Sequence, residues 1–316
     1  MEFPAVGGTV SCPDFDLAGT LASGQVFRWT QGQSPPQGRR AGPAFTGWIG
    51  PAPVRIAQED SILSFQGTSA QAVRAFFSLD LDLPAIARSI DVDPFIHAAL
   101  QSHWGLRVIR QEPWESLASF ILSAFNNIPR LTGMIEELSV RFGEKPDGVG
   151  PLRGPTPFAF PRPEALARVS ERALRRCGLG FRAPYLRAAA RSVAGGAADL
   201  ERWGGLDDDA LREKLLQIPG VGEKVVECVM LFGYGRGGAF PVDVWIGRAM
   251  RSGYFRGRRR TDRRIREFAR RHFGPMCGWA QQFLYCQARG ARHRGAWHHQ
   301  GLRTSLEAAF PSGSIS

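Results

Sequence analysis

One stretch of this sequence predicts the fold, and it reads Leu216-Gln217-Ile218-Pro219-Gly220-Val221-Gly222-Glu223-Lys224-Val225-Val226-Glu227-Cys228. Apolar residues recur at helical spacing on both sides of the Pro-Gly-Val-Gly sequence, which indicates two helices joined by a tight turn, a helix-hairpin-helix. Gly220 and Gly222 allow backbone N–H groups to come close to a phosphate, and the second helix begins there with the positive end of its dipole. These features favour DNA binding, with an ordinary corner between two helices as the alternative.

Lys224 is unusual because the chain carries its positive charge almost entirely on arginine. Of 40 Lys and Arg residues, only three are Lys. A Lys side chain can lose its proton and attack as an amine, which Arg cannot do, so Lys224 is a candidate nucleophile. A chance survivor of an arginine-rich composition is the alternative. Cys228 lies four residues later and therefore shares a helix face with Lys224.

Asp243 follows Lys224 by 19 residues, in Pro241-Val242-Asp243-Val244-Trp245, where a new helical pattern begins. Asp is a common N-cap at such a position. Capping is compatible with a role in chemistry if the capped helix end faces Lys224. Asp243 is therefore a candidate partner of the amine.

The composition predicts a nucleic-acid partner. The formal charge is +11 and the isoelectric point is near 10.3, which suits a polyanion. No apolar run approaches 18 residues and no secretory pattern is present, so we expect no membrane span. The five cysteines include no C-x-x-C pair, which suggests a reducing cytoplasm and argues against structural zinc. The expected location is cytoplasmic, nucleoid-associated in a bacterium and nuclear in a eukaryote. We expect no metal site.

The distribution of patterns predicts two domains of an α+β fold. Residues 1–110 are expected to form an antiparallel β-sheet domain with helices, 111–310 an all-α helix-hairpin-helix domain, and 311–316 a tail. The expected strands are 25–29, 45–49, 54–57 and 62–65. Helices 70–77 and 84–89 are expected to pack on that sheet. The later expected helices are 115–124, 131–142, 163–177, 183–194, 207–218, 224–232, 244–250, 262–272 and 279–288.

The segment 256–271 contains nine arginines around Asp262 and Glu267. Such a run is commonly a solvated helix face with internal salt bridges. Because the run follows the Asp243 helix, contact with phosphates is an equally weighted alternative, and it predicts binding that weakens with salt.

The hairpin, the Gly/Pro-rich stretch and Asp243 together resemble the helix-hairpin-helix–Gly/Pro–Asp superfamily of DNA base-excision glycosylases. Within it, the chain resembles the 8-oxoguanine DNA glycosylase/AP lyases. Motifs similar to those of this family occur in the same order along most of the chain. They are Ser23-Gly24-Gln25-Val26-Phe27-Arg28-Trp29, Asn126-Asn127-Ile128-Pro129-Arg130-Leu131-Thr132-Gly133-Met134, Gly178-Leu179-Gly180-Phe181-Arg182-Ala183 and Gly278-Trp279-Ala280-Gln281 with Tyr285.

The resemblance implies the chemistry. Lys224 is expected to attack C1′ of the deoxyribose, expel the base and form a Schiff base, after which β-elimination cuts the strand. Asp243 is expected to stabilise the cationic sugar. The implied partner is double-stranded DNA with 8-oxoguanine opposite cytosine, bound by a monomer. No cofactor is required, although a structural cation between the hairpin and a phosphate is left open.

The resemblance also implies which residues recognise the base and its partner. The Gly24 carbonyl would accept a hydrogen bond from N7–H, a donor that guanine lacks. Gln281 would bind the Watson–Crick edge, with Tyr285 and Cys228 on the two faces of the base. The bland alternative is that Gln281 is a surface residue and Tyr285 a core residue. The DNA-binding residues implied are Asn126, Asn127, Arg130, Phe181, Arg182, Gly220, Gly222 and Trp245.

Within that DNA-binding set, Phe181 is the expected wedge in the base stack, and Asn127, Arg130 and Arg182 would contact the orphaned base. Capping chemistry is the alternative role for Asn126 and Asn127. Two positions depart from the family pattern. Phe125 stands where the family often has a third Asn, and Trp245 replaces a His.

Two other functions fit parts of the pattern. A glycosylase for alkylated bases would use Asp243 and water, would not need Lys224 and would not cut the strand. A non-catalytic binder of DNA structures would keep the hairpin and the basic surface, yet would show no turnover.

Overall fold

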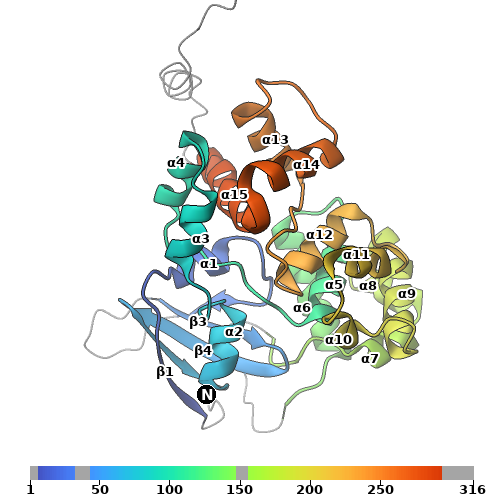
Figure 1. Cartoon of the computed structure of the whole chain (residues 1–316). Helices are drawn as coiled ribbons and strands as arrows, with labels where there is room; N and C mark the ends of the chain where they lie inside the picture. Colours follow the sequence, from blue (N-terminus) through green and yellow to red (C-terminus); the bar gives the residue numbers. More distant parts are fainter. Residues whose placement is uncertain (1–5, 33–42, 147–155, 294–316) are drawn as a thin grey trace, which may run out of the picture.

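The structure, a computed structural model, describes residues 6–32, 43–146 and 156–293 (Figure 1). The predicted tail at 311–316 lies outside these ranges. The N-terminal part is an antiparallel five-stranded sheet in the order β1-β5-β4-β3-β2, which confirms the expected α+β class. The strands are β1 (Gly7–Ser11), β2 (Thr30–Gln31), β3 (Ala44–Ile49), β4 (Ala52–Glu59) and β5 (Ile62–Gln66).

The strand predicted at 25–29 is wrong, because only Thr30–Gln31 pairs with β3. Gly24 has a φ of +80°, a left-handed conformation that interrupts an extended chain. The buried Gln25 side chain then donates to the Arg107 carbonyl and accepts from the Ile109 N–H, both at 2.8 Å. Side-chain hydrogen bonds therefore hold this segment in place of a strand ladder. Strand β1 and helix α1 (Leu17–Ala22) were not predicted from the sequence.

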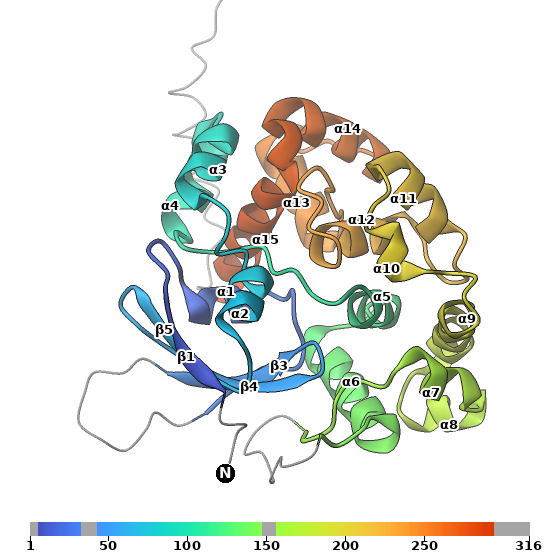
Figure 2. The ribbon, with the colours of Figure 1, turned by 60° about the horizontal axis from the view of Figure 1, so that its bottom comes forward.

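Only one of the two helices expected to pack on the sheet does so. The first, α2 (Ala70–Phe76), contacts β1 and β3. The second, α3 (Leu83–Ile90), packs instead with α4 (Pro94–Ser102) around α15 (Cys277–His293), so that prediction is wrong. Figure 2 shows α1 and α2 beside the sheet and α3, α4 and α15 grouped beyond them. Residues from before 110 and from the end of the described chain thus share one helical core.

The rest of the chain is helical, and most elements lie near their predicted positions. The predicted 163–177 helix is two helices, because Val169 is extended and Ser170 caps a new one. The helices are α5 (Pro113–Leu122), α6 (Ile128–Phe142), α7 (Pro163–Arg168), α8 (Glu171–Arg176), η1 (Gly180–Arg182), α9 (Ala183–Ala194), α10 (Leu200–Trp203), α11 (Asp208–Leu216), α12 (Glu223–Phe232), α13 (Val244–Gly253), α14 (Asp262–Phe273) and η2 (Gly274–Met276) before α15.

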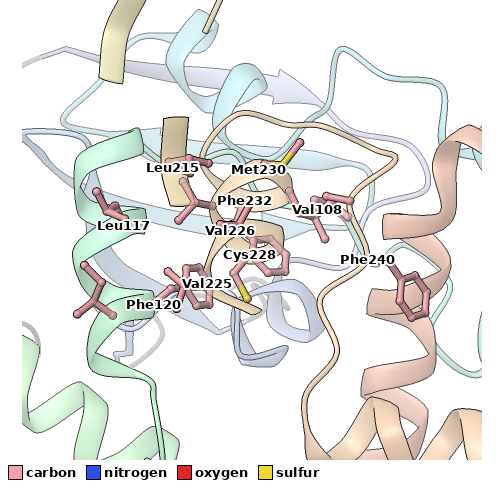
Figure 3. Close-up of a cluster of buried hydrophobic side chains, with 14 of the residues drawn as sticks. Val108, Leu117, Phe120, Leu215, Val225, Val226, Cys228, Met230, Phe232 and Phe240 are labelled. Atoms are coloured by element: carbon pink, nitrogen blue, oxygen red, sulfur yellow. The ribbon is translucent and has the colours of Figure 1, made fainter. Parts of the chain in front are cut away.

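Helix α12 lies in the helical core and packs against α5 and α11. Every residue from Val225 to Phe232 is buried, and Figure 3 shows Val225, Val226 and Cys228 among the side chains of this core. A helix that is apolar on nearly all sides is stable only when surrounded by protein. Only its first two residues, Glu223 and Lys224, are less covered.

Within the described ranges, no helix is long and apolar enough to cross a membrane. The same residues contain no group of three or more His, Cys, Asp or Glu side chains placed to hold a metal ion.

Candidate active site

The hairpin turn joins α11 to α12, as predicted, and its two glycines differ in their surroundings. Gly220 has a φ of +84°, and a Cβ there would lie 2.4 Å from the Cβ of Tyr185. Conformation and packing both require glycine at that position. Gly222 is the exposed N-cap of α12, and nothing lies within 4 Å of a Cβ built on it. The protein itself gives no reason for this second glycine, and its open side faces outward from the start of α12.

Lys224 is half-buried in the first turn of α12, and a serine holds its amine. The Nζ atom donates to Ser123 Oγ over 2.7 Å and lies 5.3 Å from the centre of the Phe120 ring. Ser123 donates its own proton to the Phe120 carbonyl at 2.7 Å, because a carbonyl oxygen can only accept. The hydroxyl therefore accepts from the amine and leaves the lone pair of a neutral amine unoccupied. Ser123 was not predicted from the sequence, and it lies three residues before the Asn-rich motif.

Asp243 caps α13, as expected, with Oδ1 accepting from the Ile246 N–H at 2.8 Å. Burial raises the pKa of this carboxyl above its ordinary value, although the Ile246 N–H and the charge of Lys224 oppose that rise. The two groups are close enough to interact electrostatically, yet no ion pair within 4.0 Å joins them in the described chain. Asp243 thus offers a half-buried negative charge near the amine without holding it directly.

Cys228 and Tyr285 are uncharged near neutral pH. Burial raises the pKa of the Cys228 thiol to about 11, against the lowering effect of Lys224. It raises the pKa of the Tyr285 phenol to about 12. Both groups interact electrostatically with Asp243, so α12, α13 and α15 converge here. The two side chains therefore lie near Lys224 and Asp243 as uncharged groups.

Gly24 lies against Tyr285 although the two residues are far apart in the sequence. A Cβ on Gly24 would lie 3.1 Å from the Tyr285 hydroxyl and 3.1 Å from Ile128 Cδ1. Together with its φ of +80°, this crowding makes glycine necessary. Gln282, which the sequence analysis did not identify, donates to the Ser23 carbonyl at 3.0 Å. It fastens the Gly24 turn to α15.

Gln281 is buried rather than on the surface, at 4% exposure. Its Oε1 atom has no hydrogen-bond partner in the part of the chain that the structure describes. A buried acceptor without a partner costs about 1–3 kcal/mol. A ligand that supplies a donor there would recover that free energy.

The Asn-rich turn uses its side chains within the protein. Asn127 caps α6 by accepting from the Arg130 N–H at 3.0 Å. The Asn126 amide donates to the Leu122 carbonyl at 3.2 Å and accepts from the Asn127 N–H at 3.1 Å. Both side chains thus make local hydrogen bonds to the backbone in this structure, as the capping alternative expected. Their contact with DNA stays a prediction. Arg130 itself is exposed.

Arg182 is buried, while Phe181 beside it is 54% exposed. The Arg182 guanidinium donates through Nε to the Ala124 carbonyl at 2.8 Å and through Nη2 to the Phe125 carbonyl at 3.0 Å. Two of its donor atoms therefore hold the Asn-rich turn, and a contact with an orphaned base stays a prediction. Trp245, half-buried in the first turn of α13, has the Arg248 guanidinium 5.3 Å from its ring centre.

Glu227 is a further residue that the sequence analysis missed. It is fully buried on α12 and accepts from the Phe240 N–H at 2.6 Å, which ties this helix to the segment that leads to Asp243. Its charge is balanced by three arginines, namely Arg212 at 2.8 Å, Arg266 at 3.4 Å and Arg270 at 3.0 Å. Removing one partner of such a buried pair costs about 3–5 kcal/mol.

The arginine run at 256–271 is partly internal. Arg266 and Arg270 face Glu227, and Arg263 and Arg264 pair with Glu267 at 2.8 and 3.9 Å. These four arginines therefore form salt bridges within the protein, as the first of the two alternatives for this segment expected.

Comparison with known sequence families gives two adjacent matches. Residues 9–117 match the family described as 8-oxoguanine DNA glycosylase, N-terminal domain. Residues 118–275 match the family described as HhH-GPD superfamily base excision DNA repair protein.

Two relatives carry consistent names. The chain is 33% identical over 307 residues to a probable N-glycosylase/DNA lyase of Methanothermobacter thermautotrophicus, covering 87% of this chain and 94% of that protein. It is 32% identical over 263 residues to the N-glycosylase/DNA lyase of Saccharomyces cerevisiae, covering 75% and 68%.

Solved structures agree with these names. MBOgg1 in complex with a low-affinity DNA ligand superposes with a TM-score of 0.83 at 32% identity, over 92% of this chain and 98% of that one. The Clostridium acetobutylicum 8-oxoguanine glycosylase/lyase, bound to DNA with cytosine opposite 8-oxoG, gives 0.81 at 29% identity, over 92% and 100%. A 3-methyladenine DNA glycosylase from Archaeoglobus fulgidus, at 0.69 and 18% identity, shares the fold.

Proposed function

The chain belongs to the 8-oxoguanine DNA glycosylase/lyase family of the HhH-GPD superfamily of base-excision repair proteins, and on this premise we propose that it removes 8-oxoguanine paired with cytosine and then cuts the strand. As a family member it is a DNA glycosylase with lyase activity that acts on DNA. The observation that carries the proposal is the Lys224 amine, held by Ser123 near the half-buried Asp243.

In the proposed reaction Lys224 Nζ attacks C1′, the bond from C1′ to the base breaks, and the amine loses a proton. The sugar ring opens to give an imine between Nζ and C1′. Loss of a C2′ proton then expels the 3′ phosphate and cuts the strand. Asp243 stabilises positive charge on the sugar as the base departs. These steps use side chains of the chain and no cofactor.

In the proposed base pocket the Gly24 carbonyl accepts from N7–H of 8-oxoguanine, and Gln281 binds the Watson–Crick edge. Three observations support this arrangement: the close approach of Gly24 to Tyr285, the unpaired Oε1 of Gln281, and the neutral Cys228 thiol. Two uncharged groups can cover the faces of a base without the cost of burying a charge.

Recognition of the opposite base is assigned to Arg130. It is exposed, and its guanidinium presents donors that suit the O2 and N3 acceptors of cytosine. Two donor atoms of Arg182 already bind backbone carbonyls of the Asn-rich turn. Arg182 therefore contributes less than Arg130 to recognition of the opposite base. The hairpin glycines Gly220 and Gly222 bind the phosphate backbone, and the enzyme acts as a monomer.

The proposal is tested with single-turnover gel assays on duplexes that carry 8-oxoguanine opposite each of the four bases. We expect base release to be followed by strand cutting, and we expect both reactions to be fastest when cytosine lies opposite 8-oxoguanine. Release of alkylated bases without strand cutting would favour the monofunctional alternative. Tight binding without turnover on any duplex would favour a non-catalytic DNA binder.

The change Gly24→Ala is expected to separate the two halves of the reaction. It places a methyl group 3.1 Å from the Tyr285 hydroxyl at a positive φ and misplaces the carbonyl. Loss of one hydrogen bond at about 1–3 kcal/mol lowers 8-oxoguanine release roughly 5- to 150-fold. Cleavage of an abasic duplex, which has no base to recognise, should be retained. Gly196→Ala, at φ +77° with nothing within 4 Å, is the matched control, and equal loss on both substrates would contradict the assignment.

The change Ser123→Ala is expected to slow base release about tenfold while leaving DNA affinity unchanged, because the amine loses the acceptor that orients it. Ser116→Ala is the control, since that buried hydroxyl lies in α5, the helix that Ser123 follows, and has no hydrogen-bond partner among the described residues. A loss of affinity or of thermal stability that equals the loss of rate would indicate a purely structural role for Ser123.

A further inference from the structure

Two exposed phenylalanine rings lie together beside the candidate active site. Phe125 is 95% exposed and Phe181 is 54% exposed. Their ring centres are 6.4 Å apart and the rings are tilted by 63°, an edge-to-face arrangement. They come from the turn between α5 and α6 and from η1 before α9. A ring as exposed as Phe125 leaves nearly all its apolar surface in water, which is unfavourable unless a partner covers it.

Phe125 is held in this exposed position rather than left loose. Its φ is +49°, a left-handed conformation that is costly for a residue with a bulky side chain. Arg182 holds the turn by donating to the Ala124 and Phe125 carbonyls. The same guanidinium stacks on the Phe181 ring, 4.3 Å from its centre. One buried arginine therefore fixes both rings.

The same turn reaches the nucleophile. Ser123, two residues before Phe125, accepts the hydrogen bond from Lys224 Nζ. Two cations flank the turn, Arg182 from η1 and Arg130 from α6. They are close enough that the charge of Arg130 adds to the lowering of the Arg182 pKa by burial. Apolar rings set among cations beside the attacking amine suit nucleic acid, whose bases offer flat apolar faces and whose backbone is anionic.

We infer that Phe125 and Phe181 form a two-ring wedge, in which Phe181 fills the gap left by the extruded base and Phe125 stacks on the base that loses its partner. This inference rests on the proposed function. Every base has an aromatic face, so stacking on Phe125 stabilises the complex whichever base lies opposite the lesion. Arg130 adds the part of the affinity that depends on cytosine. Phe125 thus adds DNA affinity that does not depend on the opposite base, and the preference among the four bases is left to Arg130.

The test uses the full chain with Lys224→Gln, so that the DNA stays intact, and duplexes with 8-oxoguanine opposite each of the four bases. Phe125→Gly removes the ring and accepts the positive φ. We expect the DNA affinity of this variant to fall about 5- to 150-fold, which is the range for loss of one aromatic ring that stacks on a base. The factor should be similar for all four duplexes. Phe125→Trp should restore the affinity. Ile62→Ala, an exposed apolar residue on β5, is the control and should change nothing.

Three results would overturn the inference. The first is an unchanged DNA affinity in Phe125→Gly, and the second is a loss of affinity confined to the duplex with cytosine. The third is a change in oligomeric state, measured by sedimentation, which would mean that the ring packs against a second copy of the chain. Cleavage by the chain with native Lys224 is measured in parallel. If that chain releases 8-oxoguanine but Phe125→Gly binds normally, only the wedge fails. If it cleaves none of the four duplexes, the proposed function fails.

Discussion

Replacement of Lys224 by Gln is expected to abolish the covalent complex that borohydride traps on 8-oxoguanine DNA. The amide cannot attack C1′ or form an imine, so base release and strand cutting should fall on the order of 10⁴-fold or more. Gln can still donate a hydrogen bond to Ser123, whose oxygen now accepts from Nζ at 2.7 Å, so the fold and the DNA affinity should be preserved. The measurements are denaturing-gel trapping, single-turnover cleavage and binding by fluorescence anisotropy.

The chain offers matched controls because it has so few lysines. Lys145 and Lys214 are both exposed and lie outside the site. Lys145→Gln and Lys214→Gln each remove one charge, as Lys224→Gln does, and should leave trapping and cleavage intact. Trapping that survives in Lys224→Gln would mean that another amine is the nucleophile.

Asp243→Asn is expected to lower the rate of base release about 10²- to 10³-fold, the range found when one preorganised electrostatic group is removed. The Asn oxygen can still accept from the Ile246 N–H, so the cap of α13 is kept. Asp243→Ala removes both the charge and the cap, and should lose about 0.5–2 kcal/mol of stability in addition. Thermal denaturation of the two variants separates these effects. An Asn variant with normal rates would exclude the carboxylate from the chemistry.

The raised pKa of Asp243 sets the pH dependence of the reaction. Below this pKa the carboxyl is neutral and cannot stabilise the cationic sugar, so the rate should fall at a higher pH than an ordinary Asp would give. The fold also holds this proton more tightly than the unfolded chain does, so ionising Asp243 opposes stability as the pH rises. Asp243→Asn should therefore lack this acidic limb and be at least as stable at neutral pH. Single-turnover rates between pH 4 and 8 test both points.

Features fixed by local pattern were predictable from the sequence. The hairpin, strands β3 to β5 and most helices follow from periodicity and turn residues. The residues 25–29 were not, because their strand-like composition yields to hydrogen bonds from the Gln25 side chain to residues more than 80 positions away. The partner of α3 was not predictable either, because an apolar stripe shows that a helix is buried but not against what.

The site shows the same limit. Chemistry-bearing residue types pointed to Lys224 and Asp243, and the structure brings them together with Cys228 and Tyr285. Ser123, Glu227 and Gln282 are ordinary polar residues whose importance comes from what they touch after folding. Arg182 shows the opposite: its residue type suggested contact with DNA, yet two of its donor atoms bind backbone carbonyls of the protein.

The burial of the cysteines has a consequence for the conditions under which this enzyme works. Burial raises the pKa of all five thiols, to about 11 for Cys228 and about 12 for Cys277 and Cys286. Peroxides attack the thiolate, and a protonated thiol resists them. The proposed substrate, 8-oxoguanine, is itself a product of oxidation. Because the five thiols of the enzyme stay protonated near neutral pH, we expect them to resist the oxidants that create such a lesion.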